Sequence, residues 1–112
     1  MKKTIPITEN RDFLRLYKRG RSLVDPSLVL YLTKNKLGVN RLGITTSKKI
    51  GKAVQRNRAR RIIREAYRSI EGSTHTGFDF VFVARGRTVK LKTGDIAFVI
   101  RRMFSSTGVL EK

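Results

Sequence analysis

The segment from Lys48 to Arg68 concentrates the candidate binding chemistry of the chain. It contains nine Lys and Arg residues, and Glu65 is its only acid. An α-helix turns about 100° per residue, so a helix here would gather cationic residues on one arc and apolar residues on the opposite arc. A solvated helix face usually mixes charges, because opposite charges three or four residues apart attract. We therefore interpret the cationic arc as a surface for a polyanion, formed by Asn57, Arg60, Arg61, Arg64 and Arg68.

Phosphate is the ligand that these residue types favour. The planar guanidinium group can bind two phosphate oxygens at once. Immediately before the helix, Lys48, Lys49 and Lys52 surround Gly51, which permits an unusual turn or a close backbone approach. The N–H groups of a helix N-terminus also attract anions, so this loop is a candidate phosphate cradle. It lacks the second Gly and the Gly-Lys-Ser/Thr ending of a nucleotide-binding P-loop.

Three aromatic residues form a second candidate site. Phe13 and Tyr17 are four residues apart and share one face of an expected helix, with Lys18 and Arg19 beside them. Tyr31 lies on the face of an expected strand that points away from the neighbouring leucines. Rings flanked by cations hold single-stranded nucleic acid without reading its sequence. Packing of the rings in a hydrophobic core is the alternative, and spacing alone favours that alternative.

Catalytic side chains are hard to find in this sequence. There is no cysteine, which excludes disulfide scaffolds, thiol catalysis and zinc fingers. The single histidine, His75, stands in a polar loop, and the eight acids show no paired spacing typical of acid–base or metal chemistry. We expect a binding protein with no catalytic and no metal-ligating side chain of its own.

Charge and length indicate the class of partner. The chain has 112 residues, and 26 Lys and Arg against 8 Asp and Glu give a net charge of +18. Nucleic acid is the default partner of such a surface. No apolar run approaches the roughly 20 residues of a membrane helix, and no signal-peptide core follows the basic start. We expect a soluble, cytoplasmic protein with no membrane partner.

Hydrophobic periodicity predicts one α+β domain over residues 1–112. A first helix, capped by Thr8 or Asn10, should end at Arg19, with Gly20 in a left-handed conformation. Helix periodicity and strand alternation then predict the remaining elements. The expected order is α-β-β-β-α-β-α, a two-layer sandwich of a four-stranded sheet and its helices. The expected strands are 21–24, 28–33, 41–46 and 78–84. The later helices are 53–70 and a last helix that begins at Thr93 or Asp95 and ends at Phe104.

The basic segment resembles a known signature. Residues 48–58 read KKIGKAVQRNR, after a Gly-Ile strand and before a further Arg-x-x-Arg. This spacing closely resembles the bacterial ribonuclease P protein subunit, with Arg56-Asn57-Arg58 as its RNR motif. The similarity extends to Asp12-Phe13, Tyr17, Gly20 and Val29-Leu30-Tyr31 upstream, and to Phe78-Asp79-Phe80-Val81 downstream.

The resemblance implies a fold and a function. The family fold is similar to the second domain of ribosomal protein S5 and has a left-handed β-α-β crossover. Its members assist a ribozyme: the RNA subunit, with bound Mg²⁺, removes the 5′ leader of precursor tRNA, so no protein side chain is catalytic. No obligate protein partner is expected. By resemblance, the residues that bind the catalytic RNA are Lys48, Lys49, Lys52, Arg56, Asn57, Arg58, Arg60, Arg61, Arg64 and Arg68.

The resemblance also assigns a role to the aromatic residues. In the family, the single-stranded leader lies between the first helix and the sheet. The matching leader-binding residues are Phe13, Tyr17, Lys18, Arg19 and Tyr31. Three alternatives remain: a structural RNA binder such as a ribosomal protein, a DNA-binding protein, and a nuclease acting alone. The sheet-rich pattern, with no helix-turn-helix, argues against the DNA-binding protein.

Overall fold

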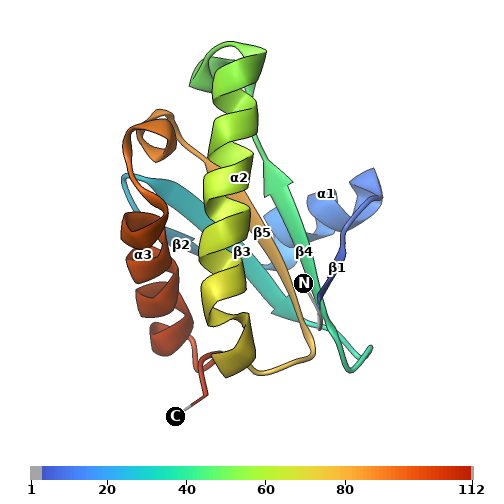
Figure 1. Cartoon of the computed structure of the whole chain (residues 1–112). Helices are drawn as coiled ribbons and strands as arrows, with labels where there is room; N and C mark the ends of the chain where they lie inside the picture. The colour runs from blue at the N-terminus through green and yellow to red at the C-terminus, as the bar shows by residue number, and fades with distance from the viewer. Residues whose placement is uncertain (1–3, 112) are drawn as a thin grey trace.

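The computed structural model describes residues 4–111, whose elements follow one another as three helices and five strands (Figure 1). The helices begin and end close to the predicted positions. The bounds are β1 (Thr4–Pro6), α1 (Asn10–Arg19), β2 (Arg21–Val24), β3 (Leu28–Lys34), β4 (Asn40–Thr45), α2 (Ala53–Ile70), β5 (Phe78–Ala84) and α3 (Thr93–Ser106), with short 3₁₀ turns η1 (Lys48–Ile50), η2 (Glu71–Ser73) and η3 (Gly86–Lys90).

The sheet has five strands in the order β1-β4-β5-β3-β2, so the prediction of four strands is wrong. The missed strand, β1, pairs in parallel with β4, and Thr4 lies opposite Asn40. Three residues are too few to show an alternating pattern, and Pro6 lacks the N–H that an inner strand needs. An edge strand of this kind forms because its partner is already in place.

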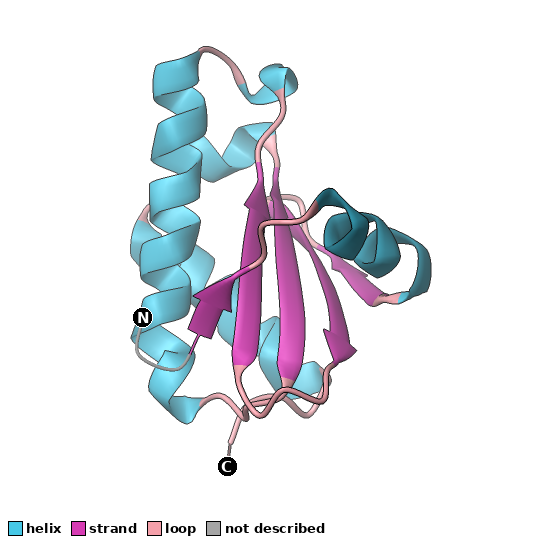
Figure 2. Ribbon diagram, turned by 90° about the vertical axis from the view of Figure 1, so that its right-hand side faces the viewer, coloured by secondary structure: helices cyan, strands magenta, loops and turns pink. Residues whose placement is uncertain are grey.

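Helices cover both faces of the sheet, so the two-layer description is incomplete. Helices α2 and α3 pack on one face and α1 lies across the other (Figure 2). Strand alternation explains the division: Leu28, Leu30 and Leu32 point to the face of α2, whereas Tyr31 points to the face of α1. The α1 side is a separate small core around Ile7, Leu16 and Val81.

The connection through α2 sets the handedness of the fold. Strands β4 and β5 are parallel neighbours. In Figure 1 both run upward, α2 descends in front of them, and the chain moves from β4 on the right to β5 on the left. This path is a left-handed crossover, the reverse of the usual hand. It places α2 over β4 and β5, with the first turns of the helix extending past the ends of the strands (Figure 1).

The helix ends differ from the prediction. Glu9 precedes α1 as its N-cap with no side-chain cap, so neither Thr8 nor Asn10 has that role. Gly20 is extended, with φ of −73° and ψ of 154°, and is not left-handed. Its small size is used differently, because a Cβ there would lie 2.6 Å from the carbonyl oxygen of Leu16. The glycine therefore allows the chain to turn tightly from α1 into β2.

Candidate nucleic-acid interface

Helix α2 divides its surface as the sequence predicts. Its apolar side chains, from Ala59 to Ile70, are buried against the sheet. On the other side, the cationic residues project into solvent over most of the length of the helix. The exposed residues of this cationic face are Asn57, Arg58, Arg61, Arg64 and Arg68.

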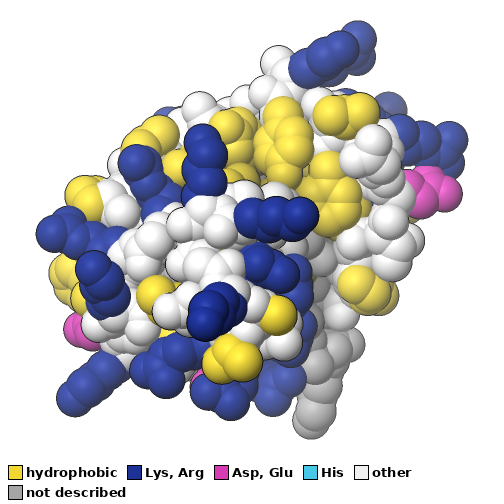
Figure 3. Space-filling view, turned by 90° about the horizontal axis from the view of Figure 1, so that it is seen from above, with side chains coloured by type: hydrophobic (Ala, Val, Ile, Leu, Met, Phe, Trp, Pro, Cys, Tyr) yellow, Lys and Arg dark blue, Asp and Glu magenta, His cyan; other side chains and the backbone are white. Residues whose placement is uncertain are grey.

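The charges of this cationic face are not neutralised within the chain. Among residues 4–111, the ion pairs involve none of the cations of α2. The one acid of the helix, Glu65, accepts a 3.5 Å hydrogen bond from Thr93. Figure 3 looks down on the end of the molecule where α2 begins: Lys and Arg are spread over this end, among apolar and neutral groups, and Asp and Glu appear only at its margins. The face therefore offers its full positive charge to a polyanion.

Three arginines of α2 are held in place by the protein itself. Arg56 donates to the carbonyl of Gly51 at 2.8 Å, and Arg60 donates to the hydroxyl of Thr46 at 2.9 Å. Arg58 reaches the η3 turn and donates to the carbonyl of Val89 at 3.3 Å. Each guanidinium keeps other N–H groups available, so these bonds orient the groups without using all their donors. Anchoring reduces the rotamer entropy that phosphate binding would otherwise cost.

The loop before α2 presents its three lysines to solvent. Lys48, Lys49 and Lys52 are all exposed. Gly51 has φ of 139°, a region that strongly favours glycine, and a Cβ there would meet the side-chain oxygen of Gln55 at 1.9 Å. That oxygen accepts the N–H of Lys52 at 2.8 Å, which closes the start of the helix. The structure thus accounts for Gly51 and leaves the side chains of the three lysines exposed to solvent.

The three predicted aromatic residues come together beneath α1. The rings of Tyr17 and Tyr31 meet edge to face, with centroids 5.0 Å apart. Phe13 and Tyr31 are half-buried against the small core, whereas Tyr17 is 36% exposed and shares a 2.9 Å hydrogen bond with Thr45. Phe13 and Tyr31 are therefore partly packed in the core, whereas the ring of Tyr17 is exposed to solvent. Lys18 and Arg19 are exposed in the last turn of α1.

A hollow of about 200 Å³ joins the aromatic group to the cationic face. Its lining includes Phe13 from α1, Gly43 and Ile44 from β4, and Arg60 and Arg64 from α2. Sequence reasoning missed this junction, because the residues come from three separate segments. The signal available in the sequence was Gly43, a glycine inside a strand, which often marks a close approach of another group.

Gly43→Ala should displace Phe13. A Cβ at residue 43 would lie 2.5 Å from the Cε1 atom of the Phe13 ring, so the ring must move away from the sheet. We expect the free energy of unfolding to fall by about 1–3 kcal/mol, which is typical of overpacking. Urea denaturation measures the change. Adding Phe13→Leu should recover part of the loss, and the same loss in both variants would contradict the steric explanation.

An ion network at the other end of the β4–β5 pair also escaped the sequence analysis. Arg41 binds Asp79 through two hydrogen bonds, of 2.9 and 2.7 Å, and reaches Asp12 at 3.3 Å. Asn35 donates a further 2.8 Å bond to Asp79. Arg41 and Asp79 lie opposite each other on adjacent strands, a pairing that only the sheet register creates. The network ties α1 and the β3–β4 loop to the sheet.

The network makes stability depend on pH. Burial acts to raise the pKa of Asp79, but the hydrogen bonds and charge of Arg41 outweigh it, and the pKa lies below its ordinary value. The ionised carboxylate therefore stabilises the folded protein fully at pH values above the pKa of an unfolded Asp, about 3.9. This stabilisation is lost as the pH falls through the lower pKa that Asp79 has in the folded protein. Asp79→Asn should cost about 1.5–3 kcal/mol at pH 7.

Unfolding experiments from pH 7 to pH 2.5 test this explanation. The wild-type protein should lose stability in the acid range, and Asp79→Asn should show a flatter profile there. Parallel profiles for the two proteins would show that Asp79 does not carry this dependence. Glu65→Gln is a suitable control, since Glu65 is exposed and lies outside the network.

The acids and the histidine do not gather into a centre. Among residues 4–111, no three His, Cys, Asp or Glu side chains lie together in a way that could hold a metal ion. His75 is exposed and its ring lies 3.9 Å from Glu111. In the same part of the chain, no helix is both long enough and apolar enough to cross a membrane.

Comparison with known proteins decides the family. The family model described as ribonuclease P matches residues 1–107. The chain belongs to the ribonuclease P protein family. The ribonuclease P protein component of Thermoanaerobacter sp. (strain X514) is 38% identical over 106 residues, which cover 95% of this chain and 91% of that protein. The component of Clostridioides difficile (strain 630) is 40% identical over 108 residues, covering 96% and 95%.

Solved structures of ribonuclease P proteins share this fold. The Staphylococcus aureus protein superposes with a TM-score of 0.82 at 33% identity, over 95% of this chain and 97% of that chain. The Thermotoga maritima protein gives a TM-score of 0.78 at 30% identity, over 88% and 93%. The recognition made from the KKIGKAVQRNR segment is thereby confirmed. The cationic face, the lysine loop and the aromatic group are thus features of a ribonuclease P protein, part of the machinery for tRNA 5′ leader processing.

Proposed function

We propose that this chain acts as the protein subunit of a ribonuclease P ribonucleoprotein, with two RNA-binding surfaces on one RNA-binding domain. The cationic face of α2 and the loop before it bind the RNA subunit. The aromatic group beneath α1 holds the single-stranded 5′ leader of precursor tRNA. The single observation that supports this division most strongly is the junction at Phe13, Gly43, Arg60 and Arg64, where the two surfaces meet.

The contact between the cationic face and the aromatic group at this junction has a mechanistic consequence. A strand leaving a structured RNA on the cationic face can pass directly over Arg60 and Arg64 towards Phe13 and the tyrosines. Arginines at the junction bind phosphates, and rings beyond it stack on bases whose sequence varies among precursors. The chain would thereby bind and orient the leader relative to the RNA subunit, which favours precursor over mature tRNA because only the precursor has a leader.

In this proposal the chain supplies no reacting group. Mg²⁺ held mainly by the RNA subunit would supply the activated water for cleavage. The contribution of the chain is positive charge, because +18 placed against RNA reduces the repulsion between phosphates that Mg²⁺ otherwise has to screen. We further propose a fold related to the second domain of ribosomal protein S5, a cytoplasmic location and no obligate protein partner.

The Mg²⁺ requirement tests this function. A ribonuclease P RNA from a Thermoanaerobacter relative is titrated with Mg²⁺ in the presence and absence of the chain, with precursor tRNA as substrate. We expect the midpoint of activity to move to lower Mg²⁺ when the chain is present. An unchanged midpoint, together with unchanged affinity for the precursor, would contradict the proposal and favour a structural RNA-binding protein.

A further inference from the structure

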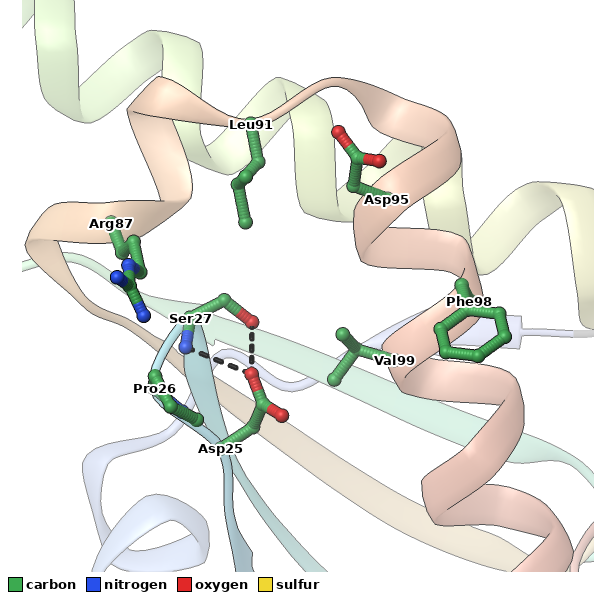
Figure 4. A pocket seen from close by; sticks show the side chains of 8 residues that line it. All are labelled: Asp25, Pro26, Ser27, Arg87, Leu91, Asp95, Phe98 and Val99. Carbon is green, nitrogen blue, oxygen red and sulfur yellow. Dashed lines mark hydrogen bonds between the residues drawn. The ribbon is translucent and has the colours of Figure 1, made fainter.

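An unusually exposed aromatic ring lies outside both surfaces. Phe98, on α3, is 67% exposed, far more than any other phenylalanine or tyrosine among residues 4–111. It lies at a hollow of about 460 Å³ between α3, η3 and the β2–β3 turn (Figure 4). Leu91 and Val99 point into this hollow from different sides, and Asp25 lies at its lower edge. The volume is in the range of small-molecule sites, about 300–1,000 Å³.

A second hollow begins on the other side of the same ring. It measures about 520 Å³ and is lined by Phe98, Arg101, Arg102 and Leu110, together with two serines. The ring of Phe98 is therefore bordered by open space on two sides, with guanidinium groups one helical turn away. Stacking on a flat group needs this geometry, whereas a ring that belongs to the core has neighbours on every side.

The charge around Phe98 favours an anionic ligand. Arg87 contributes to the first hollow and Arg101 to the second, and both are exposed. Three arginines and two acids line the two hollows, so positive charge prevails. Asp95 is exposed, and its carboxylate accepts the backbone N–H of Lys92 at 3.0 Å. Asp25 pairs with Arg102 at 2.5 Å and accepts two hydrogen bonds from Ser27. Burial acts to raise the pKa of Asp25, but these bonds outweigh it and lower the pKa, so the carboxylate stays ionised and holds Arg102 in place.

We propose that Phe98 is the stacking platform for an unpaired nucleotide of the RNA subunit. The base would lie against the Phe98 ring, and the phosphates on either side would bind Arg87 and Arg101. An aromatic ring flanked by arginines is the arrangement that holds single-stranded RNA. This inference rests on the proposed function, because the RNA subunit is its ligand, and it adds a third contact to the two surfaces described above.

The position of Phe98 separates this contact from the leader site. Helix α3 covers the face of the sheet opposite α1, so one short leader does not reach both groups (Figure 2). A second copy of the chain is disfavoured as the occupant because two surfaces rich in arginine repel each other. The nucleotide therefore belongs to the RNA subunit.

Affinity for the RNA subunit, measured without precursor tRNA, tests the inference. Phe98→Ala should weaken binding of ribonuclease P RNA about tenfold, which lies in the range expected for the loss of one stacked base. Phe98→Trp should bind within about twofold of wild type, since it retains a ring. The matched control is Leu37→Ala, which removes another exposed apolar side chain, 57% exposed, from the β3–β4 loop. Because Phe98 is exposed, the thermal midpoint should not fall in either Phe98 variant.

Ultraviolet cross-linking of the wild-type complex gives an independent result. Trypsin releases residues 93–101 as one peptide, and we expect a nucleotide adduct on Phe98 within it. Phe98→Ala binding like wild type, or an adduct that appears only with the precursor leader, would overturn the inference. Self-association that depends on Phe98 without RNA would overturn it in favour of a second copy. If the wild-type protein does not bind the RNA subunit, the proposed function is contradicted as well. If the wild-type protein binds and Phe98→Ala binds equally well, only the proposed contact at Phe98 is contradicted.

Discussion

Replacing Arg61, Arg64 and Arg68 together by Ala is expected to weaken binding of ribonuclease P RNA on the order of a hundredfold near physiological salt. All three are exposed on the cationic face, and none makes an ion pair within residues 4–111. Each lost phosphate contact should reduce the slope of log affinity against log salt by about one. Arg56 and Arg60 are less suitable, because they also bond to Gly51 and Thr46.

The control for this variant removes the same charge elsewhere. Arg11, Lys34 and Lys36 surround a different hollow, beside the β3–β4 loop. Replacing these three by Ala should change the salt slope by less than one. Equal slopes for the two triple variants would show that net charge alone drives binding and that the α2 face is not the contact. Urea denaturation of both variants establishes that their folds remain intact.

Tyr17→Ala is expected to weaken binding of precursor tRNA to the reconstituted complex about tenfold and to leave mature tRNA unchanged. One stacked base contributes about 1–3 kcal/mol, and only the precursor has an unpaired leader to stack. Tyr17 is the most exposed ring of the aromatic group, and its contact with Tyr31 is at the edge. Its removal therefore tests ligand binding more cleanly than removal of the half-buried Phe13.

Two further variants separate stacking from other effects. Tyr17→Phe retains the ring and loses only the 2.9 Å hydrogen bond with Thr45, so its precursor affinity should remain close to wild type. Leu14→Ala, at an apolar position of α1 that is 49% exposed, is the matched control. If Tyr17→Ala weakens mature and precursor tRNA equally, the group does not bind the leader.

Local patterns predict much of this fold. The alternation of Leu28, Leu30 and Leu32 placed β3 and its buried face correctly, and the helical period of 53–70 matches α2. A hydrophobic period that is repeated over many residues distinguishes a helix from a strand clearly. The edge strand β1 was missed because its three residues carry no period of their own, and its position depends on β4, more than thirty residues away.

The sequence predicts which residues form the interface, but it does not predict how residues from different segments lie next to one another. The arginines of α2 follow from composition and helical spacing within one segment. The junction at Gly43 and the Arg41–Asp79 pair depend on the register of β4 against β5 and on the left-handed crossover, which local patterns do not encode. The spacing of residues 93–104 predicts a helix whose apolar side is formed by Ile96, Val99, Ile100 and Met103. Phe98 lies off that side, and the structure shows its ring exposed.

Cleavage of a precursor tRNA at low Mg²⁺ is the most direct test of the proposed role of this chain in ribonuclease P. Three reactions are compared: a ribonuclease P RNA alone, this chain alone, and both together, with the 5′ end of the product mapped. We expect cleavage at the mature 5′ end only when both are present. Cleavage by the chain alone would contradict this role by revealing a catalytic site in the protein, and equal cleavage by the RNA with and without the chain would remove the chain from the reaction.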